Sequence, residues 1–279
     1  MRLAALFAQL VEELGARHEA VVVLEEASGQ RLSTLAARFD EEAPANLVQR
    51  AGRLSAARRS GLPLQHVVGH WGFRTLDLLQ DRRALVVRPE TETVVGVALA
   101  ELDANPAGAG RALDLGTGSG AIALALGTER AALRVIATDA STEALALAAE
   151  NRARMAPAVA ERVRLVAADW YAGIGGAGAF DLIVSNPPYV AEQEWADLEP
   201  VVREHDPRVA LVAGASGLEG VAAVLAGAAC RLVAGAPLVC EIGDGQGADV
   251  LALAEGAGAT AARVERDLAG RERVLVARF

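Results

Sequence analysis

The chain has 279 residues, of which 52% are apolar, and a formal net charge of −9 at pH 7. This length and composition predict one or two folded domains with a sizeable core, and exclude a disordered chain. No apolar run approaches the roughly 18 residues that a membrane span needs. The sequence contains no lysine, which excludes Schiff-base chemistry and a P-loop lysine.

The N-terminal part is predicted to be helical. Apolar residues at helical spacing mark an amphipathic helix from Leu3 that ends at Gly15. Shorter helices are expected at 18–29 and 32–39, the second capped by Ser33, and a longer one runs from Ala45–Asn46 to Gly61. Residues 1–65 are therefore expected to form a small helical domain.

Residues 66–88 have a different pattern, with aromatic and β-branched residues around Gly69 and Gly72, and predict a hairpin or linker. His66 and His70 are four residues apart, the spacing of a helical metal pair. Pro63 and Gly69 argue against a helix there. With only two cysteines in the chain, we expect no metal site and no disulfide framework.

Residues 89–279 are predicted to form an α/β domain. A helix is expected over 91–102 and a Gly/Pro/Ala loop over 103–110, followed by alternating apolar strands and helices. This alternation predicts a mostly parallel sheet covered on both faces. The last two strands are joined by a link too short for a parallel crossover, so we expect one of them to run antiparallel in an edge region of the sheet.

The first strand of this domain runs into a glycine-rich turn, "LDLGTGSG". Glycines 116, 118 and 120 let the backbone turn sharply and let a ligand approach the start of a helix. Asp139 ends the second strand, 23 residues after Gly116, where it can accept hydrogen bonds from a ribose diol. Such a turn alone is also compatible with NAD, with FAD or with no ligand.

The third strand ends on Asp169 and Trp170. Carboxyl ends of parallel strands meet at one edge of a sheet, so these residues are expected in the same crevice as the glycine turn. The carboxylate can accept from an adenine amino group, and the indole offers a flat wall. This pair therefore predicts the adenine side of a nucleotide-like site.

The stretch "DLIVSNPPYV" contains the fourth strand, which ends on Asn186. Pro187 and Pro188 remove two backbone donors and keep the chain extended. The Asn186 side-chain oxygen and the Pro187 carbonyl are then two converging acceptors for a planar NH₂ group, and Tyr189 offers a ring to lie against it. We interpret this corner as a grip for an NH₂ group that is methylated.

Together, "DLGTGSG", Asp139, "DW" at 169–170 and "NPPY" resemble a class I S-adenosylmethionine-dependent methyltransferase, an α/β, Rossmann-like fold. "RPETE" (88–92), "HDPRVAL" (205–211), "EIGDGQG" (241–247) and "RERVLVARF" (271–279) are similar to blocks of a narrower family. That family is the bacterial peptide-chain release factor N5-glutamine methyltransferases (PrmC/HemK family). The likeness covers the chain firmly from about residue 60. Val87 and Arg74 depart from its commonest pattern, which has a proline and an aromatic residue there.

The resemblance implies methyl transfer from S-adenosyl-L-methionine to the glutamine amide in the Gly-Gly-Gln loop of class I peptide-chain release factors, leaving S-adenosyl-L-homocysteine. It implies a catalytic role for Asn186, Pro187 and Tyr189, and substrate binding by these residues and Pro188. The implied cofactor-binding residues are Gly116, Thr117, Gly118, Ser119, Gly120, Asp139, Asp169, Trp170 and Asn186. The helical N-terminal domain (1–65), joined by the linker 66–88 to the methyltransferase domain (89–279), is expected to recognise the release factor in the cytoplasm.

Three alternatives share parts of this pattern. A sister enzyme would methylate a glutamine of a large-subunit ribosomal protein, although "RPETE" favours the release-factor branch. An adenine-N6 methyltransferase would share "NPPY", but it would have to flip a base and contact phosphates. The acidic chain makes direct nucleic-acid binding unexpected. A non-catalytic or NAD-binding protein of similar fold would have no use for an NH₂-gripping corner.

Overall fold

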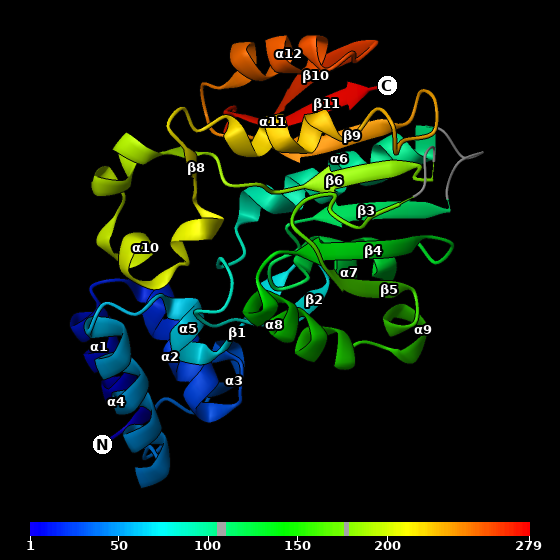
Figure 1. Cartoon of the computed structure of the whole chain (residues 1–279). Coiled ribbons are helices and arrows are strands. Elements are labelled where there is room, and N and C mark those ends of the chain that lie inside the picture. Colours follow the sequence, from blue (N-terminus) through cyan, green and yellow to red (C-terminus); the bar gives the residue numbers. More distant parts are fainter. Residues whose placement is uncertain (105–109, 176–178) are drawn as a thin grey trace. The chain divides into compact units, whose positions relative to one another are not determined.

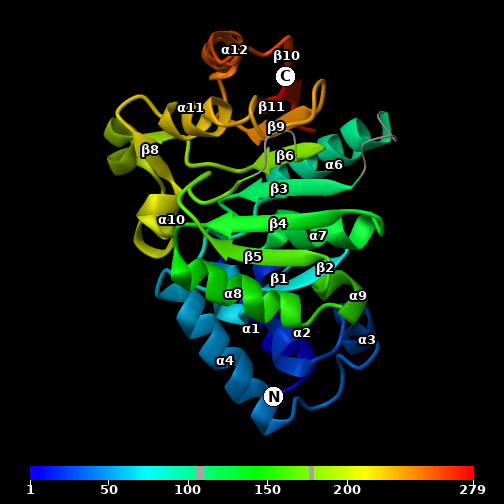
Figure 2. The ribbon, with the colours of Figure 1, turned by 45° about the vertical axis from the view of Figure 1, so that its right-hand side comes forward.

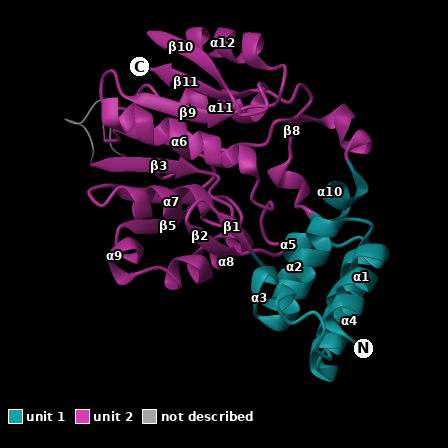
Figure 3. Cartoon of the chain, turned by 180° about the vertical axis from the view of Figure 1, so that it is seen from behind, with its two compact units in different colours: residues 1–70, 199–205 teal, residues 71–198, 206–279 magenta. Residues whose placement is uncertain are grey.

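The computed structural model describes residues 1–104, 110–175 and 179–279. The chain divides into two compact units (Figure 3). Unit 1 contains residues 1–70 and 199–205, and unit 2 contains residues 71–198 and 206–279. Most of the loop predicted over 103–110 lies outside the described residues. The predicted domain limits at 65 and 88 stay predictions.

Unit 1 consists of helices and their connections. Its helices are α1 (Leu3–Leu14), α2 (Arg17–Ser28), α3 (Leu32–Ala36), α4 (Ala45–Arg59), α5 (Leu64–Val68) and α10 (Pro200–His205). The predicted apolar stripe of α1 is confirmed, because Leu3, Leu6 and Leu10 are buried. Polar contacts join α4 to its neighbours: Ser55 donates to Glu13 of α1 at 2.5 Å, and Arg58 pairs with Glu19 of α2 at 2.8 Å.

Two local predictions in unit 1 were wrong. Ser33 does not cap α3 but lies inside it, because Glu25 of α2 already accepts from the first helical amide, that of Leu32, at 2.6 Å. Pro63 and Gly69 do not prevent a helix but bound the short α5. Proline is tolerated at a helix start, and glycine in the left-handed conformation ends a helix. His70 lies beyond α5 and contacts Glu26.

Unit 2 is built on a seven-stranded sheet within the described residues, with strand order β10-β11-β9-β6-β3-β4-β5 (Figure 1). Its strands are β3 (Arg111–Leu115), β4 (Arg134–Asp139), β5 (Val163–Ala167), β6 (Leu182–Ser185), β9 (Pro237–Glu241), β10 (Ala261–Arg266) and β11 (Glu272–Arg278). β11 runs antiparallel to both β9 and β10, and the other neighbouring strands are parallel. The predicted parallel sheet with an antiparallel edge region is therefore confirmed.

Shorter pairings accompany this sheet. β1 (His70–Phe73) and β2 (Leu76–Leu79) form the predicted hairpin, and β7 (Val190–Ala191) pairs with β8 (Val212–Gly214). The helices of unit 2 are α6 (Pro89–Ala104), α7 (Ala121–Glu129), α8 (Thr142–Ala153), α9 (Pro157–Ala160), α11 (Glu219–Ala226) and α12 (Gly247–Gly256). The Ser141 side chain caps α8, as predicted, by accepting from the Ala144 amide.

Helices cover both faces of the sheet (Figure 2). Successive side chains of a strand point to opposite faces, so both faces carry apolar side chains that need cover. In β3, Ala112 belongs to the apolar cluster that contains α6 and α7. Leu113 and Leu115, which point to the other face, belong to the opposite cluster together with residues of α11 and α12. These two clusters form the core of unit 2.

The direction in which strands are added reverses between β3 and β6. From β3 the chain continues outward to β4 and β5, whereas β6 lies on the other side of β3 and leads to β9. Leu115 and Ser185 pair at the ends of β3 and β6, and the Ser185 hydroxyl donates to the Leu115 carbonyl at 2.8 Å. Gly116 and Asn186, the next residues, therefore leave the sheet side by side at the place where open α/β sheets bind ligands.

Candidate active site

A cavity of about 430 Å³ lies at this edge of the sheet. Residues that follow β3, β4, β5 and β6 line it, and so does the connector between β2 and α6. The lining segments from these parts of the chain are 83–88, 116–119, 139–141, 168–170 and Asn186 with Pro188. Further lining residues come from 207–213 and from the start of α11. All of them belong to unit 2.

The glycine turn forms one wall of the cavity. Gly116 and Gly118 have φ of 70° and 56°, in the left-handed region that favours glycine. A Cβ at Gly116 would meet no protein atom within 4 Å, so the backbone faces open space there. The turn is held from behind, because the Thr117 amide donates to the Thr138 carbonyl at 2.8 Å and its hydroxyl donates to Asp114 at 2.6 Å. A ligand can thus approach the backbone closely.

Asp139 lies at the end of β4 and accepts two backbone hydrogen bonds. One carboxylate oxygen accepts from the Gly118 amide at 2.9 Å and the other from the Ser141 amide at 2.8 Å. Burial raises the pKa of Asp139 above its usual value, and these amide donors oppose that rise. Each oxygen retains a second lone pair. The residue can therefore accept from a pair of ligand hydroxyls at the cavity wall.

Asp169 and Trp170 both line the cavity beyond β5. Asp169 is exposed, whereas Trp170 is half-buried and packs against the apolar cluster beneath α11 and α12. Trp170 has φ of 48°, which is uncommon for a large side chain and costs about 1–3 kcal/mol. The fold thus holds the indole at the cavity in a conformation that local propensity disfavours.

Asn186 and Thr91 both line the cavity, and their side chains bond to each other. Nδ2 donates to the Thr91 hydroxyl at 3.1 Å, and that hydroxyl donates to Glu241 at 2.7 Å. Pro188 also lines the cavity, but among the described lining residues Pro187 and Tyr189 do not occur. Burial raises the pKa of the Tyr189 phenol to about 12, so it is neutral at physiological pH. Its carbonyl accepts from Gln246 at 3.1 Å.

The structure brings most of the sequence-predicted site residues to one cavity. The implied cofactor-binding residues that line it are Gly116, Thr117, Gly118, Ser119, Asp139, Asp169, Trp170 and Asn186. Gly120 does not line it. It has φ of 86° at the start of α7, where a Cβ would lie 3.3 Å from the Ala148 Cβ, so glycine serves helix packing there.

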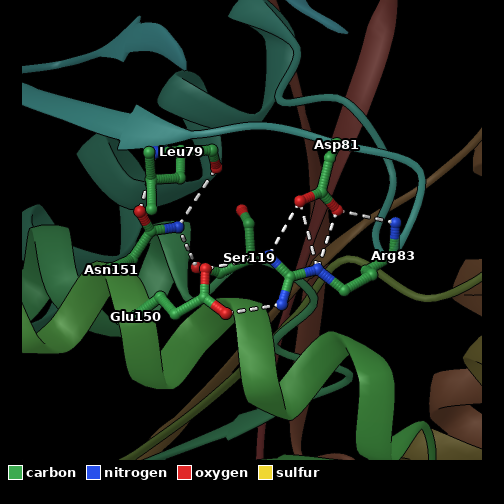
Figure 4. Close-up of polar contacts among 6 residues, drawn as sticks. All are labelled: Leu79, Asp81, Arg83, Ser119, Glu150 and Asn151. Atoms are coloured by element: carbon green, nitrogen blue, oxygen red, sulfur yellow. Dashed lines mark hydrogen bonds and ion pairs between the residues drawn. The ribbon is translucent and has the colours of Figure 1, made fainter. Parts of the chain in front are cut away.

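Residues 83–87 were not predicted to line the cavity. Hydrogen bonds and ion pairs made by Asn151 and Arg83 hold this part of the chain next to α8 (Figure 4). Buried Asn151 of α8 accepts from the Leu79 amide at 2.7 Å and donates to the carbonyls of Leu79 and Ser119 at 3.2 and 2.9 Å. Arg83 pairs with Asp81 and with Glu150. Connector residues have no local motif, so their only sequence signal was proximity to "RPETE".

Two charged residues of "RPETE" have different roles: one lines the cavity, and the other ties the hairpin to α6. Arg88 lines the cavity and donates to buried Asp206 at 2.8 Å, which also accepts from the Val86 amide at 3.3 Å. Glu92 ties the hairpin to α6 by accepting from the Arg74 amide at 2.9 Å. The "HDPRVAL" block therefore supports the cavity wall through Asp206.

The described residues provide neither a metal-ligand cluster nor a membrane-spanning helix. No cluster of three or more His, Cys, Asp or Glu side chains is placed to hold a metal ion. Across 1–104, 110–175 and 179–279, no helix combines the length and apolar character needed to cross a membrane.

Comparisons with known proteins agree with this geometry. A family model described as "Methyltransferase small domain" matches residues 96–202. A release factor glutamine methyltransferase from Cereibacter sphaeroides is 40% identical over 80% of this chain and 77% of its own length. One from Pseudomonas aeruginosa is 37% identical over 97% of this chain and 95% of its own. The chain belongs to the release factor glutamine methyltransferase family.

Structural comparison supports the fold of this release factor glutamine methyltransferase family member. A methyltransferase from Pyrococcus furiosus superposes with a TM-score of 0.50, at 21% identity, over 74% of this chain and 90% of that one. At this identity the likeness shows the Rossmann-like methyltransferase fold alone. Within the family pattern, Arg74 departs from the usual aromatic residue. It has φ of 52° and pairs with Glu129 at 2.5 Å, so an ion pair anchors the hairpin to α7.

Proposed function

We propose that this chain methylates the side-chain amide nitrogen (N5) of the glutamine in the Gly-Gly-Gln loop of class I peptide-chain release factors, using S-adenosyl-L-methionine. One observation carries the proposal. Asn186 presents a carboxamide to the cavity formed by the glycine turn and Asp139, while its own nitrogen is bound to Thr91. An NH₂-gripping acceptor next to a nucleotide-like site fits amide methylation. Membership of the family supports the same substrate.

The residues present fit the cofactor. When bound, S-adenosyl-L-methionine supplies a methyl group on a positively charged sulfur that a nucleophile can attack. The open space beside Gly116 suits its methionine end. Asp139 suits the ribose hydroxyls, and Asp169 with Trp170 suits the adenine. Segment 83–88 lines the same cavity and would contact the bound molecule.

The substrate amide nitrogen is a poor nucleophile, because its lone pair is delocalised into the carbonyl. Asn186 Oδ1 and the Pro187 carbonyl accept its two N–H groups and direct the lone pair towards the methyl carbon. Attack by this nitrogen on the methyl carbon would form the carbon–nitrogen bond and break the carbon–sulfur bond, with the electron pair left on sulfur. One amide proton leaves to water, and the product is S-adenosyl-L-homocysteine. Positioning and fixed polar groups supply most of the acceleration.

We assign to unit 1 the recognition of the same release factor. Unit 1 presents a helix, α4, that contains four arginines and no acidic residue, although the unit as a whole is close to neutral. Arg58 and Arg50 already pair with Glu19 and Glu26 of α2. The exposed Arg53 and Arg59 would therefore be the ones to meet acidic groups of a protein partner. We place the reaction in the cytoplasm, where release factors act, and assign no nucleic-acid ligand to this acidic chain.

Mass spectrometry tests the proposal directly. A purified class I release factor is incubated with this protein and S-adenosyl-L-methionine, and the peptide containing the Gly-Gly-Gln loop is sequenced. A gain of one methyl on that glutamine is expected. Modification of a ribosomal protein or of nucleic acid instead, with the release factor unchanged, would overturn the proposed substrate.

A further inference from the structure

Thr91 connects the amide-gripping corner to a buried carboxylate. It belongs to the first turn of α6, whereas Asn186 follows β6 and Glu241 ends β9. Thr91 and Glu241 are 5% and 1% exposed. The hydroxyl lies 2.7 Å from Glu241 Oε2 and 3.1 Å from Asn186 Nδ2. Three segments that are distant in sequence thus meet in one chain of hydrogen bonds.

Which group donates and which accepts in these hydrogen bonds follows from counting protons. A hydroxyl has one proton to donate and two lone pairs, and an ionised carboxylate can only accept. Thr91 must therefore donate to Glu241 and can only accept from Asn186. Only the NH₂ end of the Asn186 carboxamide can satisfy that demand, so the oxygen is left facing the cavity.

We propose that Thr91, held by Glu241, is a positioning residue that fixes the Asn186 carboxamide with its oxygen towards the substrate amide. The inference rests on the proposed function and extends it to the residues that orient the corner. Without this support, the carboxamide can turn over and present NH₂ to the substrate NH₂, and two donors cannot bond each other. "RPETE" and "EIGDGQG" thereby each contribute one residue to the same task.

The charge of Glu241 makes the arrangement sensitive to pH. Burial raises the pKa of Glu241 to about 7, opposed by the Thr91 hydrogen bond. The other titratable or charged groups facing it are Arg273, Glu90, Arg88, Tyr189 and Cys240. When Glu241 gains a proton, it donates to Thr91, and the freed Thr91 proton can bond Asn186 Oδ1. That arrangement turns the wrong end of the carboxamide to the substrate.

The test compares Thr91→Val, which removes the hydroxyl at constant shape, with Thr91→Ser, which keeps it. Thr91→Val should lower kcat by about ten- to hundredfold, by analogy with the loss of a residue that orients a metal ligand through a hydrogen bond. Thr91→Ser should recover turnover to within a few-fold. KM for the release factor and the dissociation constant for S-adenosyl-L-methionine should change little. Thr128→Val, which removes a hydroxyl bonded only within α7, serves as the matched control and should keep the wild-type kcat.

The pH profile separates positioning from a structural role. Wild-type kcat should fall below about pH 7, following Glu241, and Thr91→Val should lack this acid limb. Glu241→Gln, whose side-chain oxygen can still accept from Thr91, should also lack the limb. It supplies a second measurement if Thr91→Val does not fold.

The outcomes distinguish the two proposals. Unchanged kcat in Thr91→Val, or an acid limb retained in both variants, overturns the positioning role while the enzyme remains a methyltransferase. Failure of the wild-type protein to modify the release factor overturns the proposed function instead.

Discussion

At the scale of single residues, Asn186 has the most direct part in the proposed reaction. Replacing it with alanine removes the acceptor that aims the substrate lone pair. We expect kcat to fall by about 10²–10³-fold, as for loss of one fixed polar group at a reacting centre. Binding of S-adenosyl-L-methionine should weaken only a few-fold, because the glycine turn and Asp139 remain.

Single-turnover kinetics and a cofactor titration measure the two quantities separately for Asn186→Ala. Asn46→Ala, at an exposed position of α4, is a control that should match the wild type in both. An equal loss of turnover and of cofactor affinity in Asn186→Ala would contradict the assigned role.

Sequence reasoning placed Asn186, Asp139 and Trp170 at the cavity because each follows a strand of a parallel sheet. Such positions are set by the local pattern and by one topological rule. Thr91 was not identified, because it lies 95 residues from Asn186 and on a helix. Only the folded chain shows that the first turn of α6 meets the ends of β6 and β9. Contacts of this kind have no local sequence signal.

At the scale of elements, α8 fixes both the hairpin and the glycine turn through Asn151 (Figure 4). Asn151→Ala would leave the Leu79 amide and two carbonyls without their partner in a buried place. The expected loss of stability is about 2–3 kcal/mol, within the cost of unsatisfied buried groups. Cofactor affinity should also weaken, because Ser119 and segment 83–88 line the cavity.

Urea unfolding and a cofactor titration measure these effects of Asn151→Ala. The neighbouring Glu150→Ala provides a matched control on the same helix, since Glu150 is exposed and its ion pair with Arg83 is solvated. We expect Glu150→Ala to remain close to the wild type. Equal stability losses at positions 150 and 151 would contradict the anchoring role of Asn151.

The first turn of α11 packs directly on the proline corner. A Cβ at Gly220 would collide with the Pro188 carbonyl oxygen and approach the Pro187 Cβ to 3.2 Å. Gly220→Ala should therefore displace the corner and lower kcat by more than tenfold. The expected loss of kcat is this large because a displacement of about 1 Å at a reacting centre lowers the rate by up to about 10²-fold.

Steady-state kinetics on Gly220→Ala and Gly256→Ala test this prediction. Gly256 ends α12, and a Cβ there would meet nothing within 4 Å. Its replacement should leave kcat unchanged and raise the unfolding midpoint slightly, because alanine favours helix. Wild-type turnover in Gly220→Ala would show that the corner tolerates the shift.

Long elements were predicted better than short ones. The central sheet strands and the helix α7 follow from continuous apolar runs, because they are buried on every side. The helices α1 and α8 follow from apolar residues at helical spacing, because each buries one face. α9, α10 and the β7–β8 pairing were missed. These elements are two to six residues long, too short for a period to register. α10 also belongs to the compact unit of the N-terminal helices, although it lies after residue 198.

At the scale of the whole molecule, the core under the site contains a buried acid. Asp114 lies in the middle of β3 and is fully buried, and this burial raises its pKa to about 7. Its carboxylate accepts a hydrogen bond from the Thr117 hydroxyl, and this bond supports the glycine turn. The strand that carries the turn is thus less stable when Asp114 is ionised.

The sign of the resulting pH dependence follows from proton binding. Between the ordinary Asp pKa near 4 and the folded pKa of about 7, the folded state binds more protons than the unfolded state. The free energy of unfolding therefore decreases as pH rises through this window, by up to about 1.4 kcal/mol per pH unit from this one group. Above about pH 7 the contribution is constant.

Asp114→Asn removes the titration while keeping an oxygen that can accept from Thr117. Urea unfolding of both proteins at pH 5, 6, 7 and 8 should show the variant gaining stability relative to the wild type up to about pH 7, with no further gain at pH 8. Titrating groups that do not interact with Asp114 act equally in both proteins and cancel in the difference; Asp139, whose charge helps to raise the Asp114 pKa, is the exception. Thr128→Val, which removes no titratable group, should show a difference that does not change with pH. A constant difference for Asp114→Asn as well would mean that Asp114 titrates at the same pH in the folded and unfolded chains.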